Sequence, residues 1–429
     1  MVKPGDVVRI ATKDATYHGI LMPRPIILDK NITVIKLDNG YNIGISNDKI
    51  EKTELVSEYK PKQEGRQEIG HKRDLPLIPI LSFGGTISSR VDYRTGGVYA
   101  DYTAEDFVEM MPELRNIANL KAQKVMGMMS EDFTPTDWKV MAKAICKELN
   151  SEARGVVVTQ GTDTLHFSTA AMSFMIRNLH KPVVFTASQR SIDRGSSDTF
   201  MNLVCSVNAA AKFDAAEVMT CLHGSTEDSH CILIRGTKVR KMHTSRRDAF
   251  RPINELPFAN VYEDGRIEKI NNSYRSIGEG KAELDDKFED KTALVIVYPG
   301  MEPKVIDFYA EHGYKGIVLA ATALGHVPTE TSGKNILPNI KKAIDIGIPV
   351  VIASQTLYGR VHPLVYTNLR KLSIELQCIF AEDMLPEVAY VKLGWVLGHT
   401  NKMDKVREMM LTNYAGEITE RTDEKSFLF

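Results

Sequence analysis

The sequence predicts an α/β protein in which a small β-barrel domain precedes a two-domain α/β core. Three observations predict this architecture. Short β-rich runs separated by turns fill the first 57 residues, strand and helix patterns alternate from Leu75 onward, and a charged stretch at 278–291 divides the alternating region in two. A chain of 429 residues is also too long for one small core, so two or three domains are expected.

Residues 1–57 are predicted to form the β-barrel domain. Turn signals separate its expected strands, and the tripeptide Asp38-Asn39-Gly40 is typical of a tight hairpin. The strands are expected at 6–10, 15–21, 32–37 and 41–45. The polar stretch that follows, residues 58–74, has the composition of a linker.

Residues 75–277 are predicted to form a large α/β domain. Apolar runs of strand length alternate with helical segments, which favours a mostly parallel sheet with helices on its faces. Asp198 is expected to be the N-cap of the last of these helices. The expected strands are 76–82, 155–160, 182–187, 217–222 and 231–235, and the expected helices are 104–111, 135–149, 164–178 and 198–212.

The remainder of the chain is predicted to form a second linker, a smaller α/β domain and a tail. The charged residues 278–291 are poor in β-branched side chains and are expected to be the linker. The smaller domain is expected at 292–413, and the polar residues 414–429 are expected to form an exposed tail. The three core strands of the smaller domain are expected at 293–298, 316–320 and 348–353.

Composition and charge narrow the class of protein. The chain has 54 Lys and Arg against 55 Asp and Glu, and this balance argues against a protein that coats nucleic acid through bulk charge. Its five cysteines show no C-x-x-C spacing, which fits a reducing compartment better than a disulfide framework. No signal-peptide core and no apolar run long enough to span a bilayer is present, so we expect a cytoplasmic protein.

Two glycine-rich loops carry threonines directly after buried strands. The first is Gly84-Gly85-Thr86-Ile87, and the second is Gly161-Thr162-Asp163-Thr164. Open α/β sheets bind ligands at the carboxyl ends of their strands, and a threonine hydroxyl becomes a nucleophile when a base activates it. Thr86 is the candidate nucleophile, and Tyr93 lies in a nearby flexible segment that can close over it. A single Gly-Gly-Thr sequence would indicate only a turn.

Thr162, Asp163 and Lys241 form a second candidate group. A lysine that lies near other cations loses part of its preference for the charged form and can then accept a proton. Lys241 has such neighbours in the sequence, with only Asp248 opposing them: Arg235, Lys238, Arg240, Arg246, Arg247 and Arg251. The alternative is an exposed hairpin whose charges are simply solvated, and spacing does not exclude it.

Ser130 and Glu131 suit the two ends of an α-amino acid. The serine hydroxyl can bind the α-carboxylate, and the glutamate can bind the ammonium group. Judged alone, the pair is more typical of a helix-capping segment before Pro135 than of a substrate site.

Metal and nucleotide sites are not favoured on this chain. Zinc-type residues occur together between two apolar runs, but a hairpin turn is expected there and no second cluster supports a metal site. These residues are His223, Glu227, His230 and Cys231. The chain has no P-loop and no G-x-G-x-x-G motif, so no ATP or NAD site is expected on it.

Four ordered motifs together resemble the bacterial-type L-asparaginase family. They are Ser82-Phe-Gly-Gly-Thr-Ile-Ser88, Ser130-Glu131-Asp132, Thr159-Gln-Gly-Thr-Asp-Thr164 and Gly236-Thr-Lys-Val-Arg-Lys241, and the resemblance runs from about Leu75 to about Tyr414. It implies an asparaginase-like core of two α/β domains and a site between the subunits of at least a dimer. It also implies that Thr86 is acylated with Tyr93 as its partner, and that Thr162, Asp163 and Lys241 form a second catalytic group. Ser130 and Glu131 would then bind the substrate's α-carboxylate and α-amino groups.

Two positions depart from the family's pattern. Phe83 stands where the family usually has a small residue or threonine, and altered packing is expected there rather than lost activity. Glu131 stands where many free asparaginases have glutamine, a change that can shift substrate preference.

The regions outside the asparaginase-like core indicate which subfamily the chain resembles. The β-rich N-terminal domain, the Asp92-Tyr-Arg-Thr-Gly96 segment and the ending Leu411-Thr-Asn-Tyr-Ala-Gly-Glu-Ile-Thr-Glu-Arg421 are similar to the GatD family, the D subunits of archaeal-type glutamyl-tRNA(Gln) amidotransferases. This resemblance implies a homodimeric glutaminase that passes ammonia to a partner, the E subunit, within a heterotetramer. The partner would carry the ATP and magnesium sites and most contacts to tRNA(Gln), so no cofactor is expected on this chain.

Two other functions stay open at this point. The first is a free cytoplasmic L-asparaginase, because the same chemistry hydrolyses both amides and the sequence does not rank glutamine against asparagine. The N-terminal β domain argues against it. The second is a non-catalytic module that contacts RNA through residues 235–251 or the β domain, and the complete set of catalytic residue types argues against that.

Overall fold

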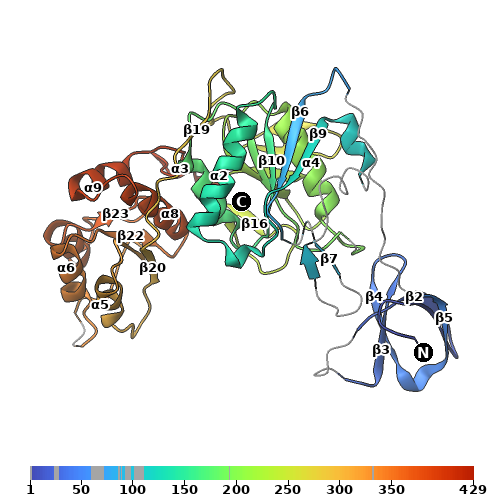
Figure 1. Cartoon of the computed structure of the whole chain (residues 1–429). Coiled ribbons are helices and arrows are strands. Elements are labelled where there is room, and N and C mark those ends of the chain that lie inside the picture. Colours follow the sequence, from blue (N-terminus) through green and yellow to red (C-terminus); the bar gives the residue numbers. More distant parts are fainter. Residues whose placement is uncertain are drawn as a thin grey trace.

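The chain forms three units in a row (Figure 1). In this computed structural model, the N-terminal β domain lies at one end, a large α/β domain in the middle and a smaller α/β domain at the other end. The structure describes residues 2–23, 29–58, 72–85, 87, 89–91, 98–100, 111–192, 194–330 and 333–429, with the side chains of 89–91, 98–100 and 112 excepted. The predicted helix at 104–111 lies outside the described residues, apart from Met111.

The N-terminal domain is one curled antiparallel sheet of five strands in the order β4-β3-β2-β1-β5. Gly40 has a φ of +83° in the β3–β4 turn, as the Asp-Asn-Gly signal predicts. The buried core is small and consists of Val8, Ile10, Ile35 and Ile45. The strands are β1 (Val7–Thr12), β2 (Thr16–Leu21), β3 (Ile32–Leu37), β4 (Asn42–Ser46) and β5 (Ile50–Ser57), with a 3-10 turn, η1 (Asn47–Lys49), before β5.

The large domain is built on an eight-stranded sheet in the order β18-β17-β14-β13-β12-β10-β6-β9. The five strands from β9 to β13 run parallel, as predicted, and the other three run antiparallel. The parallel strands are β6 (Leu77–Ser82), β9 (Asn119–Lys124), β10 (Val156–Thr159), β12 (Val183–Thr186) and β13 (Val218–His223). The antiparallel strands are β14 (Cys231–Arg235), β17 (Ala259–Val261) and β18 (Ile267–Lys269).

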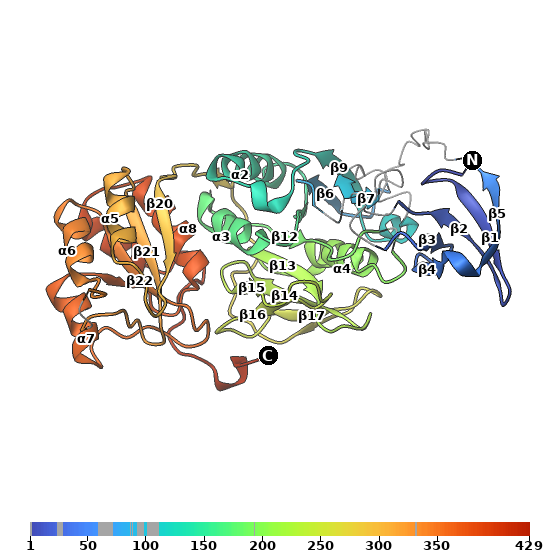
Figure 2. The ribbon, with the colours of Figure 1, turned by 90° about the horizontal axis from the view of Figure 1, so that it is seen from below.

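Helices cover both faces of this sheet (Figure 2). Helices α2 (Pro135–Leu149) and α3 (Leu165–Met175) pack on one face, and α4 (Thr199–Lys212) packs on the other. Asp198 is the N-cap residue of α4, as predicted, but its carboxylate makes no capping hydrogen bond to the helix. It accepts hydrogen bonds from the main-chain N–H groups of Gln189 and Arg190, so it folds the preceding loop instead.

Several short elements complete the large domain. The pairs are β7 (Ser89–Val91) with β8 (Val98–Ala100), β11 (Ile176–Arg177) with β19 (Glu283–Leu284), and β15 (Val239–Lys241) with β16 (Phe250–Pro252). Two 3-10 turns, η3 (Pro112–Asn116) and η4 (Ser130–Asp132), flank β9.

The smaller domain has a parallel four-stranded sheet in the order β20-β21-β22-β23. Its strands are β20 (Thr292–Ile296), β21 (Gly316–Ala321), β22 (Val350–Ser354) and β23 (Ile379–Phe380). Its helices are α5 (Lys304–Glu311), α6 (Leu337–Asp345), α7 (Thr367–Arg370) with the π-turn η5 (Lys371–Glu375), α8 (Pro386–Leu397) and α9 (Met403–Leu411). Together with the β-rich N-terminal domain, the two core domains confirm the predicted fold class.

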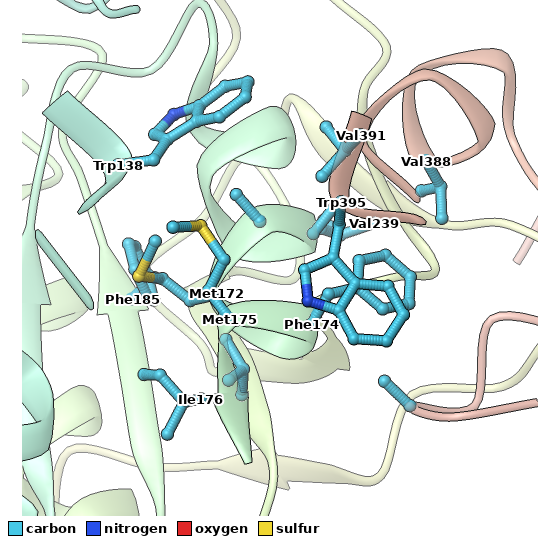
Figure 3. Packing of buried hydrophobic residues seen from close by; sticks show 14 of the residues in the cluster. Trp138, Met172, Phe174, Met175, Ile176, Phe185, Val239, Val388, Val391 and Trp395 are labelled. Atoms are coloured by element: carbon cyan, nitrogen blue, oxygen red, sulfur yellow. The ribbon is translucent and has the colours of Figure 1, made fainter. Parts of the chain in front are cut away.

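Helix α8 joins the two core domains. Nearly all of its residues are buried, because it packs between its own sheet and α3 of the large domain. Figure 3 shows Trp395 of α8 against Phe174 of α3, and the two rings stack with centroids 5.8 Å apart. The domains therefore share one continuous apolar core.

The predicted linker at 278–291 is packed against both domains rather than free. Its β19 pairs with β11, and its Phe288 ring is buried edge-on against Trp138 with centroids 5.7 Å apart. The Asp285 carboxylate accepts a hydrogen bond from Trp395 Nε1 of α8 at 3.2 Å.

The expectation of an exposed tail at 414–429 is wrong for its first half. Ala415 is buried and Glu417 is fully buried, and the segment lies against both core domains. The chain ends after a 3-10 turn, η6 (Glu424–Ser426), with exposed apolar residues. Among the described helices, none is long and apolar enough to cross a bilayer.

Candidate active site

Three loops meet where β6, β9 and β10 end. These strands are parallel neighbours, so the loops that begin at residues 83, 125 and 160 leave the same edge of the sheet. Gly84 and Gly85 have φ values of +98° and +82°, a region that side chains other than glycine rarely adopt. A Cβ at Gly85 would lie within 2.8 Å of three main-chain atoms of Gln160 and Gly161. The glycines therefore allow the main chains of the two threonine loops to touch.

Thr86 and Tyr93 lie outside the described residues. The residues on either side of Thr86 are described: Gly85 packs against Gly161, and Ile87 is buried in the core on the α4 side of the sheet. Phe83, which departs from the family's pattern, is fully buried in the core on the opposite side.

The second predicted group is assembled in the structure. Lys241 Nζ donates hydrogen bonds to Thr162 Oγ1 at 2.8 Å and to Asp163 Oδ1 at 2.6 Å. Thr162 is buried, whereas the Asp163 side chain is 64% exposed. The group is therefore open to solvent on the side of the Asp163 carboxylate. When the Lys241 amine is neutral, its nitrogen can accept the proton of the Thr162 hydroxyl.

Lys241 is not on an exposed hairpin. It ends β15, and the residues before it, Thr237, Lys238 and Val239, are buried. The prediction that uncompensated positive charge surrounds Lys241 is also wrong, because each of the six neighbouring cations pairs with a carboxylate. Arg235 pairs with Glu217 and Glu255, Lys238 with Asp383, Arg240 with Glu387, Arg247 with Asp228, and both Arg246 and Arg251 with Asp248.

Ser130 connects the second and third loops. Its Oγ accepts a hydrogen bond from the Asp163 N–H at 3.2 Å, and its carbonyl accepts one from Thr164 Oγ1 at 2.5 Å. Glu131 is exposed, and its carboxylate has no hydrogen-bond partner among the described residues. Neither residue caps α2, since Thr134 and Asp137 form a capping box there.

Sequence reasoning missed His166, which lies on α3 one turn beyond Asp163. Burial, together with the charges of Arg240 and Lys241, lowers the pKa of His166 to about 3. The ring is therefore neutral at physiological pH and adds no charge beside Lys241. Gln160 was missed too: it is fully buried, and neither polar atom of its side-chain amide has a partner within the described structure.

His223, the first of the zinc-type residues, makes hydrogen bonds to other side chains within the fold. His223 is fully buried, with Nδ1 2.6 Å from Asn202 Oδ1 and Nε2 3.0 Å from Asp228 Oδ1. Throughout the described part of the chain, no three His, Cys, Asp or Glu residues are arranged to hold a metal ion.

Three family models match the chain. Residues 2–56 match the GatD N-terminal domain, residues 77–275 match the family described as Asparaginase, N-terminal, and residues 291–410 match the Glutaminase/Asparaginase C-terminal domain. Among solved structures, the thermostable L-asparaginase from Thermococcus kodakarensis aligns with a TM-score of 0.72 at 30% identity, covering 80% of this chain and 100% of that one. L-asparaginase I from Vibrio cholerae aligns with a TM-score of 0.70 at 26% identity, over 80% and 99%.

Relatives that match along the whole length share the N-terminal domain as well. The D subunit of glutamyl-tRNA(Gln) amidotransferase from Thermococcus kodakarensis is 50% identical over 430 residues, which cover 99% of this chain and 96% of the relative. The D subunit from Pyrococcus furiosus is 50% identical over 433 residues, covering 100% and 97%. This chain therefore belongs to the GatD family of glutamyl-tRNA(Gln) amidotransferase subunits, whose asparaginase-type domains make it the amidohydrolase subunit of a ligase complex.

Proposed function

We propose that this chain is a glutaminase that hydrolyses the side-chain amide of glutamine through a threonine acyl-enzyme. The Thr86 oxygen attacks the amide carbon, its proton passes to the leaving nitrogen, and ammonia departs to leave a glutamyl ester. Water then attacks the ester, releasing glutamate and returning the proton to the Thr86 oxygen. The proposal is carried by the contact of Lys241 with Thr162 in a chain whose full-length relatives are amidotransferase subunits.

Lys241 and Thr162 supply the base in this scheme. When its amine is neutral, Lys241 can take the proton of the Thr162 hydroxyl, and Thr162 can in turn take one from the attacking group. Asp163 holds the lysine ammonium at 2.6 Å and keeps it aimed at the threonine. The neutral His166 avoids a second positive charge next to this relay.

The amino-acid end of the substrate is bound by Ser130 and Glu131. The Ser130 side chain packs against Gly161, next to Thr162, so a carboxylate held by its hydroxyl would lie beside the second threonine. The carboxylate of Glu131, which is exposed and has no hydrogen-bond partner among the described residues, would pair with the substrate's ammonium group. Tyr93 would close over the nucleophile.

The ammonia is used by a partner. We infer a homodimer that binds the E subunit of the amidotransferase, which uses ATP and magnesium to activate Glu-tRNA(Gln) and convert it to Gln-tRNA(Gln) in the cytoplasm. Two features support this assignment: the chain has no nucleotide-binding motif, and its balanced charge does not favour a large tRNA surface.

Ammonia release tests the proposal. The purified chain is given glutamine or asparagine, alone and then with the E subunit, ATP and Glu-tRNA(Gln). Slow release that rises only with the partner and the charged tRNA is the expected result, and Thr86→Ala should abolish the release while the complex still assembles.

A free L-asparaginase is the second candidate, because solved L-asparaginases share the fold of the two core domains. Rapid asparagine turnover by the chain alone, unchanged by the additions, would establish that function instead.

A further inference from the structure

We propose that residues 414–417, here called the C-terminal clamp, position Lys241 for amide hydrolysis. The inference rests on the proposed function, because it gives Lys241 a catalytic role. The clamp leaves the smaller domain after α9 and runs along the large domain towards the end of the chain, near β16 (Figure 2). Two of its main-chain carbonyls bind the segment 236–241 that carries the lysine.

Both contacts come from buried side chains of that segment. Thr237 Oγ1 donates a hydrogen bond to the Ala415 carbonyl at 3.0 Å, and Lys238 Nζ donates one to the Glu417 carbonyl at 2.9 Å. Thr237 is fully buried and Lys238 is 1% exposed. If one of these donors is lost, a buried carbonyl is left without a hydrogen-bond partner. Because this costs free energy, the main chain around the carbonyl shifts.

The clamp is itself held in shape from within. The Glu417 carboxylate accepts hydrogen bonds from the main-chain N–H groups of Tyr414 at 3.0 Å and Ala415 at 2.7 Å. It also pairs with the buried ammonium of Lys392 on α8 at 2.6 Å. Gly416 has a φ of +71°, and a Cβ there would lie 2.6 Å from Arg235 Nε. The carbonyls at 415 and 417 are thus aimed by a fixed loop.

The smaller domain holds the same segment at two further points. Lys238 Nζ pairs with Asp383 Oδ2 at 2.7 Å, and Arg240 pairs with Glu387 at the start of α8. The main chain leading to Lys241 is therefore fixed from the smaller domain, while the Lys241 side chain reaches Thr162 in the large domain. Because a misplacement of about 1 Å can cost on the order of 100-fold in rate, this attachment bears directly on catalysis.

Thr237→Val tests the clamp by removing one hydroxyl and keeping the shape of the side chain. Thr292→Val is the matched control, since Thr292 is also buried and donates to a main-chain carbonyl at 3.1 Å, but in β20, away from the segment. Thr237→Ser restores the donor. Steady-state ammonia release from glutamine is measured in the assembled complex for all three variants and the wild type.

We expect Thr237→Val to lower kcat by about 10-fold to 100-fold with KM changed less than about twofold, Thr237→Ser to recover most of kcat, and Thr292→Val to match the wild type. A kcat for Thr237→Val within about twofold of Thr292→Val would overturn the proposal. Should Thr237→Val not fold, Gly416→Ala displaces the clamp itself, with Gly359→Ala as its control, because Gly359 has a φ of +89° and open space around it.

A second measurement does not depend on activity. Pulsed acetylation read by peptide mass spectrometry reports how well Lys241 is held, since its side chain is only 10% exposed and its ammonium is bound to Thr162 and Asp163. Faster labelling of Lys241 in Thr237→Val than in Thr292→Val supports the clamp, and equal rates contradict it. If the wild type releases no ammonia in any assembly, the proposed function fails, while the labelling rates still decide whether the clamp exists.

Discussion

Gly85→Ala should separate the two threonine loops and remove most of the activity. The new Cβ would lie within 2.8 Å of main-chain atoms of Gln160 and Gly161, and neither main chain can rotate out of the way as a side chain would. Reaching an ordinary contact requires the loops to part by about 1 Å. The positive φ adds about 1–2 kcal/mol of backbone strain, and the overlap adds about 1–3 kcal/mol. A shift of this size predicts a loss of about 100-fold in ammonia release.

Gly347→Ala is the matched control for this experiment. Gly347 has a φ of +87°, close to the +82° of Gly85, but nothing lies within 4 Å of a Cβ built there. It therefore carries the backbone strain without the overlap, and it should lose about 1–2 kcal/mol of stability with normal activity. Thermal unfolding and ammonia release from glutamine are measured for both variants in the complex. If Gly85→Ala retains activity within about twofold of Gly347→Ala, the close approach of the two loops is not needed for catalysis.

Three further predictions concern the site and the domain junction. Lys241→Met keeps the stem but removes the amine, so ammonia release should fall by about 100-fold to 10,000-fold with the melting temperature nearly unchanged, and a loss below about tenfold would exclude Lys241 as the base. Because the pKa of His166 is about 3 in the folded chain, against about 6.5 unfolded, the unfolded state binds the extra proton as the pH falls below 6.5, and stability is lost in the window from about 6.5 to 3. Urea unfolding of the wild type and His166→Leu should show that the wild type loses about 1.4 kcal/mol relative to the variant between pH 7.5 and 5.5, whereas parallel curves would mean that His166 is not held neutral. Phe288→Ala should cost about 3–5 kcal/mol in the same unfolding experiment, because the ring is buried against Trp138 and α8, and a cost below about 1 kcal/mol would mean that residues 278–291 are a free linker after all.

The features that sequence predicted well are encoded locally. The strand 155–160 and the helix 135–149 were predictable because an unbroken apolar run and an amphipathic segment after Pro135 each specify their own structure. The loops were predictable for the same reason, since consecutive glycines such as Gly84 and Gly85 mark positive φ. Strand β5 was missed because most of its side chains are polar or exposed, as is common for a strand at the edge of a sheet.

The features that sequence missed depend on partners far away along the chain. Residues 414–419 have the composition of a tail, but the buried Glu417 pairs with Lys392 on α8. The sequence places Lys238 among the cations beside Lys241, whereas in the structure it pairs with Asp383, 145 residues away. Asp198 has the right type and place for a helix cap and instead folds the loop before it. Such pairings follow from the tertiary fold and leave no local pattern.

The identity of the acylated residue shows whether the reaction passes through an ester on Thr86. The complex is mixed with isotope-labelled glutamine, quenched in acid during the first turnover, digested and analysed by peptide mass spectrometry, with Thr86→Ala treated in the same way. We expect a glutamyl ester on Thr86 in the wild type and none in the variant. A glutamyl group on Thr162, or turnover without any trapped ester, would contradict this expectation.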